Sequence, residues 1–176
     1  MNLVPGAPGW LLAILFAALL AAAIEDFLRL RISNITCAVV VVAALVAMGI
    51  AGFSLDLWQN FAVFAVLLAG GTVLFVSGKV GGGDVKLLAG LGLWVNIGAG
   101  IWLLANSLIA GGVLALIYIA ARHLRQPRGG KRVKESKGIP YGIAIATGAC
   151  LVFAGQLGWL TPQPQAPVPF QLNAGG

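Results

Sequence analysis

In this strongly hydrophobic chain, two aspartates lie directly at the ends of apolar segments. Asp26 lies at the end of the first long apolar run, and Asp84 follows Gly81, Gly82 and Gly83. A charge at membrane depth costs on the order of 2.5–3.5 kcal/mol on insertion scales, so an acid there is a candidate for function. Two carboxyl groups that share a site resist double ionisation, and one then serves as an acid while the other is a base. This chemistry hydrolyses peptide bonds without a metal or a bound cofactor, and we expect neither.

The glycines before Asp84 suit such a site, because glycine has no Cβ and lets an extended peptide come close to the backbone. Simpler interpretations stay open for both acids. Asp84 could be a helix N-terminal acid favoured by the helix dipole. Asp26 could be an interfacial residue paired with Arg29 or Arg31.

The composition is that of an integral membrane protein. The 176 residues are 60% hydrophobic and 9% charged, against about 25% charged residues in soluble domains. The mean hydropathy is +0.98. A zinc peptidase is excluded because the chain has one histidine and no His-Glu-x-x-His, and a serine hydrolase because it has no Gly-x-Ser-x-Gly. The two cysteines lack metal-ligand spacing, so we interpret them as membrane-core residues.

Six apolar segments are predicted to cross the membrane, and they lie at about 10–28, 35–53, 57–77, 82–96, 97–121 and 139–160. The fourth is short for the ~20 residues that a bilayer requires. An extended or broken start is tolerated there if it lines a cavity. The tail 161–176 has four prolines and no charge, and we expect it to be irregular. The fold class predicted is an all-α membrane protein, a six-transmembrane-helix bundle in a single domain over 1–176.

The charges predict its orientation. With six spans, the loops after the first, third and fifth share a side, and they hold all 11 basic residues. Basic loops face the cytoplasm, so we expect both termini outside it. Asp26 and Asp84 then lie at one depth near the cytoplasmic face, on two different helices. The basic residues serve orientation in this interpretation, and we expect no nucleic-acid partner.

Three stretches resemble the motifs of type IV prepilin peptidases, a family of membrane aspartic peptidases. Asp26 with Arg29, Arg31, Ile32 and Asn34 resembles the first motif of the family. Residues 81–89 resemble the second motif, Gly-x-Gly-Asp-x-Lys-Leu. Residues 139–142, with Ala144 and Gly148, resemble the start of the family's last helix. The three matches occur in the family's order.

The resemblance implies an aspartic endopeptidase that removes the basic leader from prepilin or pseudopilin precursors in the bacterial cytoplasmic membrane. Asp26 and Asp84 would be its catalytic pair, and the glycines before Asp84 would admit the substrate backbone. Lys86, Arg29 and Asn34 are further candidates for substrate binding. The simpler interpretation of Lys86 is a lysine at the membrane interface. The simpler interpretation of Arg29 is a residue that determines the topology. The sequence does not predict an oligomeric state.

The chain departs from the family pattern at two places. Ser33 stands where the family usually has proline. The cytoplasmic loop with paired Cys-x-x-Cys of the larger, bifunctional members is missing, so we do not expect N-methylation of the mature pilin. The chain resembles the small, peptidase-only branch associated with Flp-type (Tad) pili.

The alternative from a different class is a membrane transporter or assembly subunit in which Asp26 and Asp84 form an ion or proton relay. A relay usually needs polar groups across the whole bilayer. The outer halves of the predicted spans offer few, namely Gln59, Asn60, Asn96, Asn106 and Ser107. This scarcity favours chemistry near the membrane surface.

Overall fold

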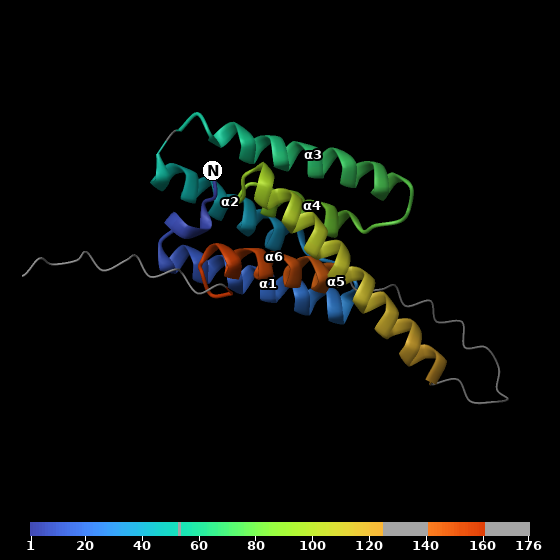
Figure 1. The fold of residues 1–176 in the computed structure, drawn as a ribbon. Helices are drawn as coiled ribbons and strands as arrows, with labels where there is room; N and C mark the ends of the chain where they lie inside the picture. The colour runs from blue at the N-terminus through green and yellow to red at the C-terminus, as the bar shows by residue number, and fades with distance from the viewer. Residues whose placement is uncertain (53, 125–140, 161–176) are drawn as a thin grey trace, which may run out of the picture.

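The computed structural model describes residues 1–52, 54–124 and 141–160, and within these ranges all regular structure is helical. A short 3-10 helix, η1, precedes six α-helices (Figure 1). The helices are η1 (Val4–Gly6), α1 (Gly9–Arg29), α2 (Asn34–Ala51), α3 (Leu57–Val76), α4 (Gly82–Gly92), α5 (Ile97–Leu124) and α6 (Tyr141–Gln156). The predicted all-α class is confirmed. Residues 125–140, which hold most of the basic loop and the start of the third motif, and the tail 161–176 lie outside the described residues.

Four helical segments are long and apolar enough to cross a membrane, namely α1, α2, α3 and residues Ile97–Ala121 of α5. The other two are shorter, because α6 has 16 residues and α4 has 11. At about 1.5 Å per residue, neither matches the roughly 30 Å of a hydrocarbon core. The structure therefore contains four candidate spans of full length and two shorter apolar helices.

The predicted fourth span, 82–96, is helical only as far as Gly92. The irregular part lies at its end, not at its start as we expected. Beyond Gly92 the amides of Leu93, Trp94 and Val95 bond to carbonyls three residues earlier. The Asn60 amide of α3 donates to the Leu93 carbonyl oxygen at 2.8 Å. Partners from outside the helix thus satisfy carbonyls that would otherwise be unpaired in an apolar interior.

The N-terminal segment completes the bundle beyond the end of α4. The Leu3 amide donates to the Trp94 carbonyl oxygen at 3.0 Å. The Asn2 side chain accepts a hydrogen bond from the Asn96 amide at 3.1 Å. Leu3 and Val4 are buried against the core. The short helix is therefore extended in space by the N-terminal segment of the chain.

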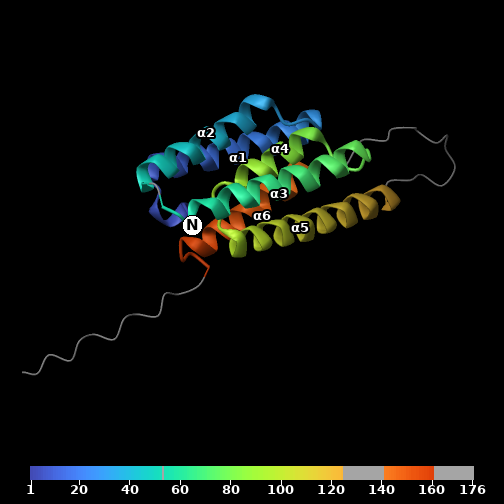
Figure 2. The same cartoon turned by 90° about the horizontal axis from the view of Figure 1, so that it is seen from above.

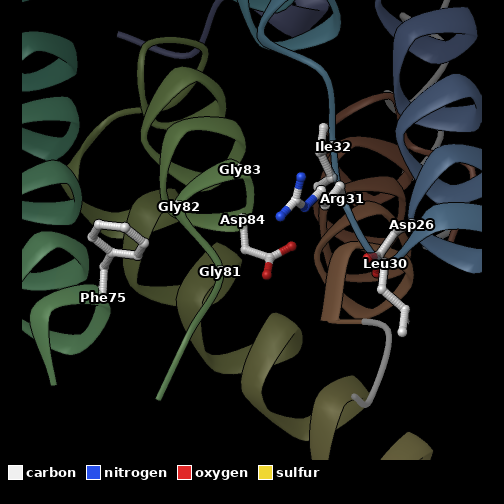
Figure 3. Close-up of a pocket in the computed structure, with 9 residues that line it drawn as sticks. All are labelled: Asp26, Leu30, Arg31, Ile32, Phe75, Gly81, Gly82, Gly83 and Asp84. Carbon is white, nitrogen blue, oxygen red and sulfur yellow. The ribbon is translucent and has the colours of Figure 1, made fainter. Parts of the chain in front are cut away.

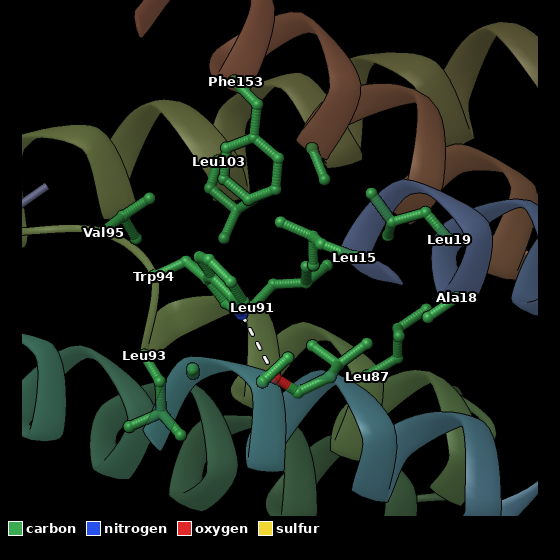
Figure 4. Close-up of a cluster of buried hydrophobic side chains, with 14 of the residues drawn as sticks. Leu15, Ala18, Leu19, Leu87, Leu91, Leu93, Trp94, Val95, Leu103 and Phe153 are labelled. Carbon is green, nitrogen blue, oxygen red and sulfur yellow. Dashed lines mark hydrogen bonds between the residues drawn. The ribbon is translucent and has the colours of Figure 1, made fainter. Parts of the chain in front are cut away.

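Although it is short, α4 is the central helix, and it contacts α2, α3, α5 and α6 (Figure 1 and Figure 2). Leu87, Ala89 and Leu91 on α4 are fully buried. Figure 4 shows Leu87, Leu91 and Trp94 beside Leu15 and Phe153, which come from α1 and α6. The core thus holds α4 from several sides and sets the position of the acid at its start.

A hydrogen bond and a ring contact add direction to this core. The indole N–H of Trp94 donates to the Val40 carbonyl oxygen at 3.2 Å, a bond dashed in Figure 4. The rings of Phe16 and Phe153 meet edge to face with centroids 6.4 Å apart. The first contact links the end of α4 to α2, and the second links α1 to α6.

Glycines let the neighbouring helices approach α4 closely. A β-carbon at Gly71 of α3 would lie 2.6 Å from Val85 Cγ1 on α4. One at Gly92 of α4 would lie 3.0 Å from Val63 Cγ1 on α3. Small residues at helix interfaces allow such backbone contact in membranes, where packing and not water exclusion drives association.

Two adjacent glycines of α3 provide a matched test of this packing. We expect Gly71→Ala to lower the free energy of unfolding by about 1–3 kcal/mol, the usual cost of overpacking, because its β-carbon would overlap Val85. Gly70→Ala meets no atom within 4 Å and should leave the stability unchanged or slightly raised. Reversible unfolding of both variants in detergent would measure the difference, and equal stabilities would contradict the close α3–α4 contact.

Candidate active site

Asp26 lies in the last turn of α1 and has 3% of its surface exposed. The helix ends at Arg29, and the next residue, Leu30, adopts a left-handed conformation with φ +53°. The Leu30 amide donates to the Asp26 carbonyl oxygen at 2.8 Å. A positive φ is uncommon for a residue with a side chain. Here it turns the chain sharply, so that the loop to α2 passes beside Asp26.

Ser33, the residue at the predicted departure from the family motif, is the N-cap of α2. Its hydroxyl accepts a hydrogen bond from the Thr36 amide at 3.1 Å. The Ser33 amide donates to the Glu25 carboxylate at 2.8 Å, and the Thr36 hydroxyl donates to the same group. Glu25 is therefore bound to the start of α2, and unlike Asp26 it is not among the residues that line the pocket described below.

Asp84 is the third residue of α4, and 8% of its surface is exposed. The start of α4 packs directly on the loop between α1 and α2. A β-carbon at Gly83 would lie 3.0 Å from the backbone oxygen of Ile32 and 3.2 Å from its nitrogen. Gly83 therefore permits the contact that brings the start of α4 to the end of α1.

Asp26 and Asp84 line one pocket of about 360 Å³ (Figure 3). The rest of its lining comprises Leu30, Arg31, Ile32, Phe75, Gly81, Gly82 and Gly83. Figure 3 shows the Asp84 carboxyl group and the Arg31 guanidinium group both directed into the space between α4 and the α1–α2 loop. The charge of Asp26 acts on Asp84 across this space. The pocket thus contains two buried, interacting carboxyl groups beside a wall of glycines.

A backbone amide from a third element also reaches the pair. Gly142, at the start of α6, donates its N–H to Asp26 Oδ2 at 2.6 Å. Within the described residues, no group of three or more His, Cys, Asp or Glu side chains is arranged to hold a metal ion. The chemistry on offer is therefore that of two carboxyl groups and their hydrogen-bond donors.

The structure divides the residues predicted from sequence into two groups. It brings Asp26, Asp84 and the three glycines before Asp84 together in the pocket. Arg29, Asn34 and Lys86 are not part of the pocket lining. Lys86 Nζ instead donates to Asn34 Oδ1 at 2.8 Å, which links α4 to α2 on an exposed surface.

Four lining residues were not predicted as site residues, namely Leu30, Arg31, Ile32 and Phe75. Arg31 and Ile32 belong to the first motif, so their position in it was an available signal. Phe75 lies near the end of α3, where its ring would be 3.2 Å from a β-carbon at Gly82. No sequence pattern marks Phe75, because only the packing of α3 beside α4 brings it to the pocket.

A model of the type IV leader peptidase family matches residues 13–116. The matched part contains both aspartates and every residue that lines the pocket. The chain belongs to the type IV leader peptidase family. No match was found among curated proteins or among solved structures.

Membership confirms the resemblance that the motifs indicated, and it makes this leader peptidase a protease. The long apolar helices make it a multi-pass membrane protein. The matched residues end within α5, so α6 of the leader peptidase, with Gly142, lies beyond them.

Substitutions at two glycines of the pocket test whether a backbone contact matters more than a side-chain contact. We expect Gly83→Ala to lower peptidase activity by about 10²-fold, the order of loss that a 1 Å misplacement produces, because its β-carbon would push against the Ile32 backbone. The nearest atoms to a β-carbon at Gly82 belong to the Phe75 ring, a side chain that can change its rotamer, so Gly82→Ala should lose less activity than Gly83→Ala. Initial rates of leader cleavage would compare them, and equal losses would count against a specific role for the Ile32 contact.

Proposed function

We propose that this leader peptidase is an aspartic endopeptidase that removes the leader from Flp-like type IV prepilins at the cytoplasmic face of the membrane. The observation that carries the proposal is the common pocket of Asp26 and Asp84, which come from two different helices. Both carboxyl groups are buried and their charges interact. That is the arrangement in which one acid retains a proton while the other is ionised.

Such a pair hydrolyses an amide by general acid–base catalysis. The ionised carboxylate takes a proton from a water molecule, whose oxygen attacks the carbonyl carbon of the scissile bond. The protonated carboxyl group donates to the carbonyl oxygen. When the tetrahedral intermediate collapses, the leaving nitrogen takes a proton and the C–N bond breaks. The two acids titrate as one unit.

The walls of the pocket suit an extended peptide. Gly81, Gly82 and Gly83 present backbone without side chains on the α4 side, so a substrate strand has close access to Asp84. Leu30 and Phe75 add apolar surface, and Arg31 adds a cation. Arg29, Asn34 and Lys86 lie outside the lining, and we propose that they contact the substrate away from the scissile bond.

The orientation follows from the basic residues of the described chain. Arg31 lines the pocket, and three further basic residues lie on the chain close to it: Arg29 at the end of α1, Lys79 in the α3–α4 connection and Lys86 in α4. Met1 lies at the opposite end of the bundle (Figure 1), where it contacts Asn60. By the positive-inside rule the pocket faces the cytoplasm. We propose a bacterial cytoplasmic membrane protein with six membrane-embedded helices and both termini outside the cytoplasm, in one peptidase domain.

Polar residues in the outer part of the bundle support hydrolysis over an ion relay. The Asn60 amide donates to the backbone oxygens of Leu93 and Met1. The Asn106 amide donates to the carbonyl oxygen of Trp102 on its own helix. These two amide groups satisfy backbone acceptors, which is a structural use of polarity. N-methylation is not part of the proposal, because the chain has two cysteines and so cannot form paired Cys-x-x-Cys motifs.

Leader cleavage tests the proposal directly. Membranes that contain the wild-type protein should shorten a tagged Flp-like prepilin, whereas Asp26→Ala and Asp84→Ala should abolish cleavage, because each removes one half of the acid–base pair. Asp56→Ala is the matched control, since that exposed acid lies in the α2–α3 connection, and it should cleave like wild type. Gel mobility of the pilin measures the product. Cleavage that survives either catalytic substitution would show that the pair is misassigned, and no cleavage of any prepilin would overturn the function.

The pH dependence tests whether one proton is shared. Cleavage requires one ionised and one protonated carboxyl group, so the rate should fall at low pH, where both are protonated, and at high pH, where both are ionised. Initial rates in detergent across the pH range in which the protein stays folded would give a bell-shaped profile. A rate that rises to a plateau with no alkaline loss would argue against the protonated partner.

A further inference from the structure

The first turn of α6 meets the carboxyl group of Asp26 inside the bundle. The Gly142 amide donates to Asp26 Oδ2 at 2.6 Å, and the contact is buried. The next amide, that of Ile143, acts on the same carboxyl group. The first amides of a helix have no partner within the helix. Here a side chain from α1 supplies that partner.

The contact depends on the absence of a side chain at position 142. A β-carbon there would lie 2.9 Å from both Cβ and Oδ2 of Asp26, and 2.8 Å from Ile32 Cδ1. Since Asp26 and Ile32 are both buried, neither is free to move away without disturbing the pocket. Any larger residue would therefore separate the start of α6 from Asp26.

Two amides at a helix N-terminus favour the ionised form of a carboxyl group, through the hydrogen bonds and through the helix dipole. Asp84 is placed differently. Its carboxyl group lies against Gly81 at the start of its own helix, where a β-carbon would be 2.7 Å from Asp84 Oδ2, and the charge of Asp26 acts on it. The negative charge of the pair is thus better stabilised on Asp26.

We propose that the first turn of α6 positions Asp26 as the ionised base of the pair, with Gly142 as the positioning residue and Asp84 as the proton carrier. The proposal rests on the proposed function. Asp26 takes a proton from the water whose oxygen bonds to the carbonyl carbon, and Asp84 gives its proton to the carbonyl oxygen. On collapse the C–N bond breaks, the nitrogen takes the proton from Asp26, and a hydroxyl of the intermediate returns a proton to Asp84.

Within the residues that the structure describes, few other charged groups surround Asp26. Asp84 from α4 and Arg31 from the loop share its pocket. On its own helix Glu25 bonds to Ser33 and Thr36, and Arg29 lies outside the lining. Lys86 of α4 bonds to Asn34 of α2. Residues 141–160, which include all of α6, contain no charged residue. The groups of α6 that interact with Asp26 are therefore backbone amides.

An NMR measurement tests the contact without any need for activity. In full-length protein labelled with 15N-glycine, the Gly142 resonance is identified by its loss in Gly142→Ala. We expect this amide to be shifted downfield and slow to exchange with solvent in wild type and in Asp84→Ala. Both features should be lost in Asp26→Ala. Identical exchange in wild type and Asp26→Ala would overturn the proposal.

Three glycines of α6 provide matched variants for the kinetic test. A β-carbon at Gly155 meets nothing within 4 Å, whereas one at Gly148 would lie 2.6 Å from the Ser107 amide nitrogen of α5. Gly155→Ala thus controls for the substitution itself, and Gly148→Ala for disturbed α5–α6 packing. Gly142→Ala should lower kcat by about 10²-fold with little change in KM, because the base is misplaced.

The pH profile separates positioning from a general packing defect. Without the α6 amides Asp26 accepts a proton more readily, so the acid limb of the Gly142→Ala profile should move to higher pH. Gly148→Ala should lose stability and keep the wild-type profile. A Gly142→Ala enzyme with the kcat and profile of Gly155→Ala would overturn the proposal while leaving the peptidase function intact. If wild type cleaved no prepilin, the proposed function would fail, and the NMR result would still decide the contact.

Discussion

The burial of two carboxyl groups in an apolar bundle is the constraint on which the rest of this structure depends. A buried charge is tolerated only with a compensating partner. Asp26 obtains its partner from the backbone of α6, and Asp84 lies at the start of α4 beside the glycine turn. Since the charge of one acts on the other, placing both in one pocket favours a state with a single shared proton.

Glycine is the means by which three separate elements reach this pair. Gly83 lets α4 rest on the backbone of the α1–α2 loop, and Gly142 lets α6 rest on Asp26. Gly71 lets α3 lie against Val85 on the first turn of α4. Because apolar side chains gain little by leaving lipid for one another, close backbone packing is what joins membrane helices. The same packing here sets the distances within the pocket.

The short central helix explains why the pocket opens at one end of the bundle. Asp84 lies at the start of α4, and the opposite end of that helix is closed by Asn60 and the N-terminal segment. Polar groups are thus used for structure at one end and remain available for chemistry at the other. In the proposed function, the leader reaches the pocket from this open end of the bundle, near Arg31, Lys79 and Lys86.

The sequence by itself determined the membrane class and the helical segments, because long apolar runs are local properties of the chain. It also predicted that Asp26 and Asp84 lie at one depth on different helices, and the tertiary structure brought them to one pocket. Motif positions also identified the glycines before Asp84, and they contained the signal for Arg31. The end of α4 at Gly92, the approach of Phe75 to Gly82, the Lys86–Asn34 bond and the Gly142–Asp26 bond were decided only by the tertiary structure. Each depends on which helices become neighbours and how closely, and that is a property of three-dimensional packing between residues far apart in the chain.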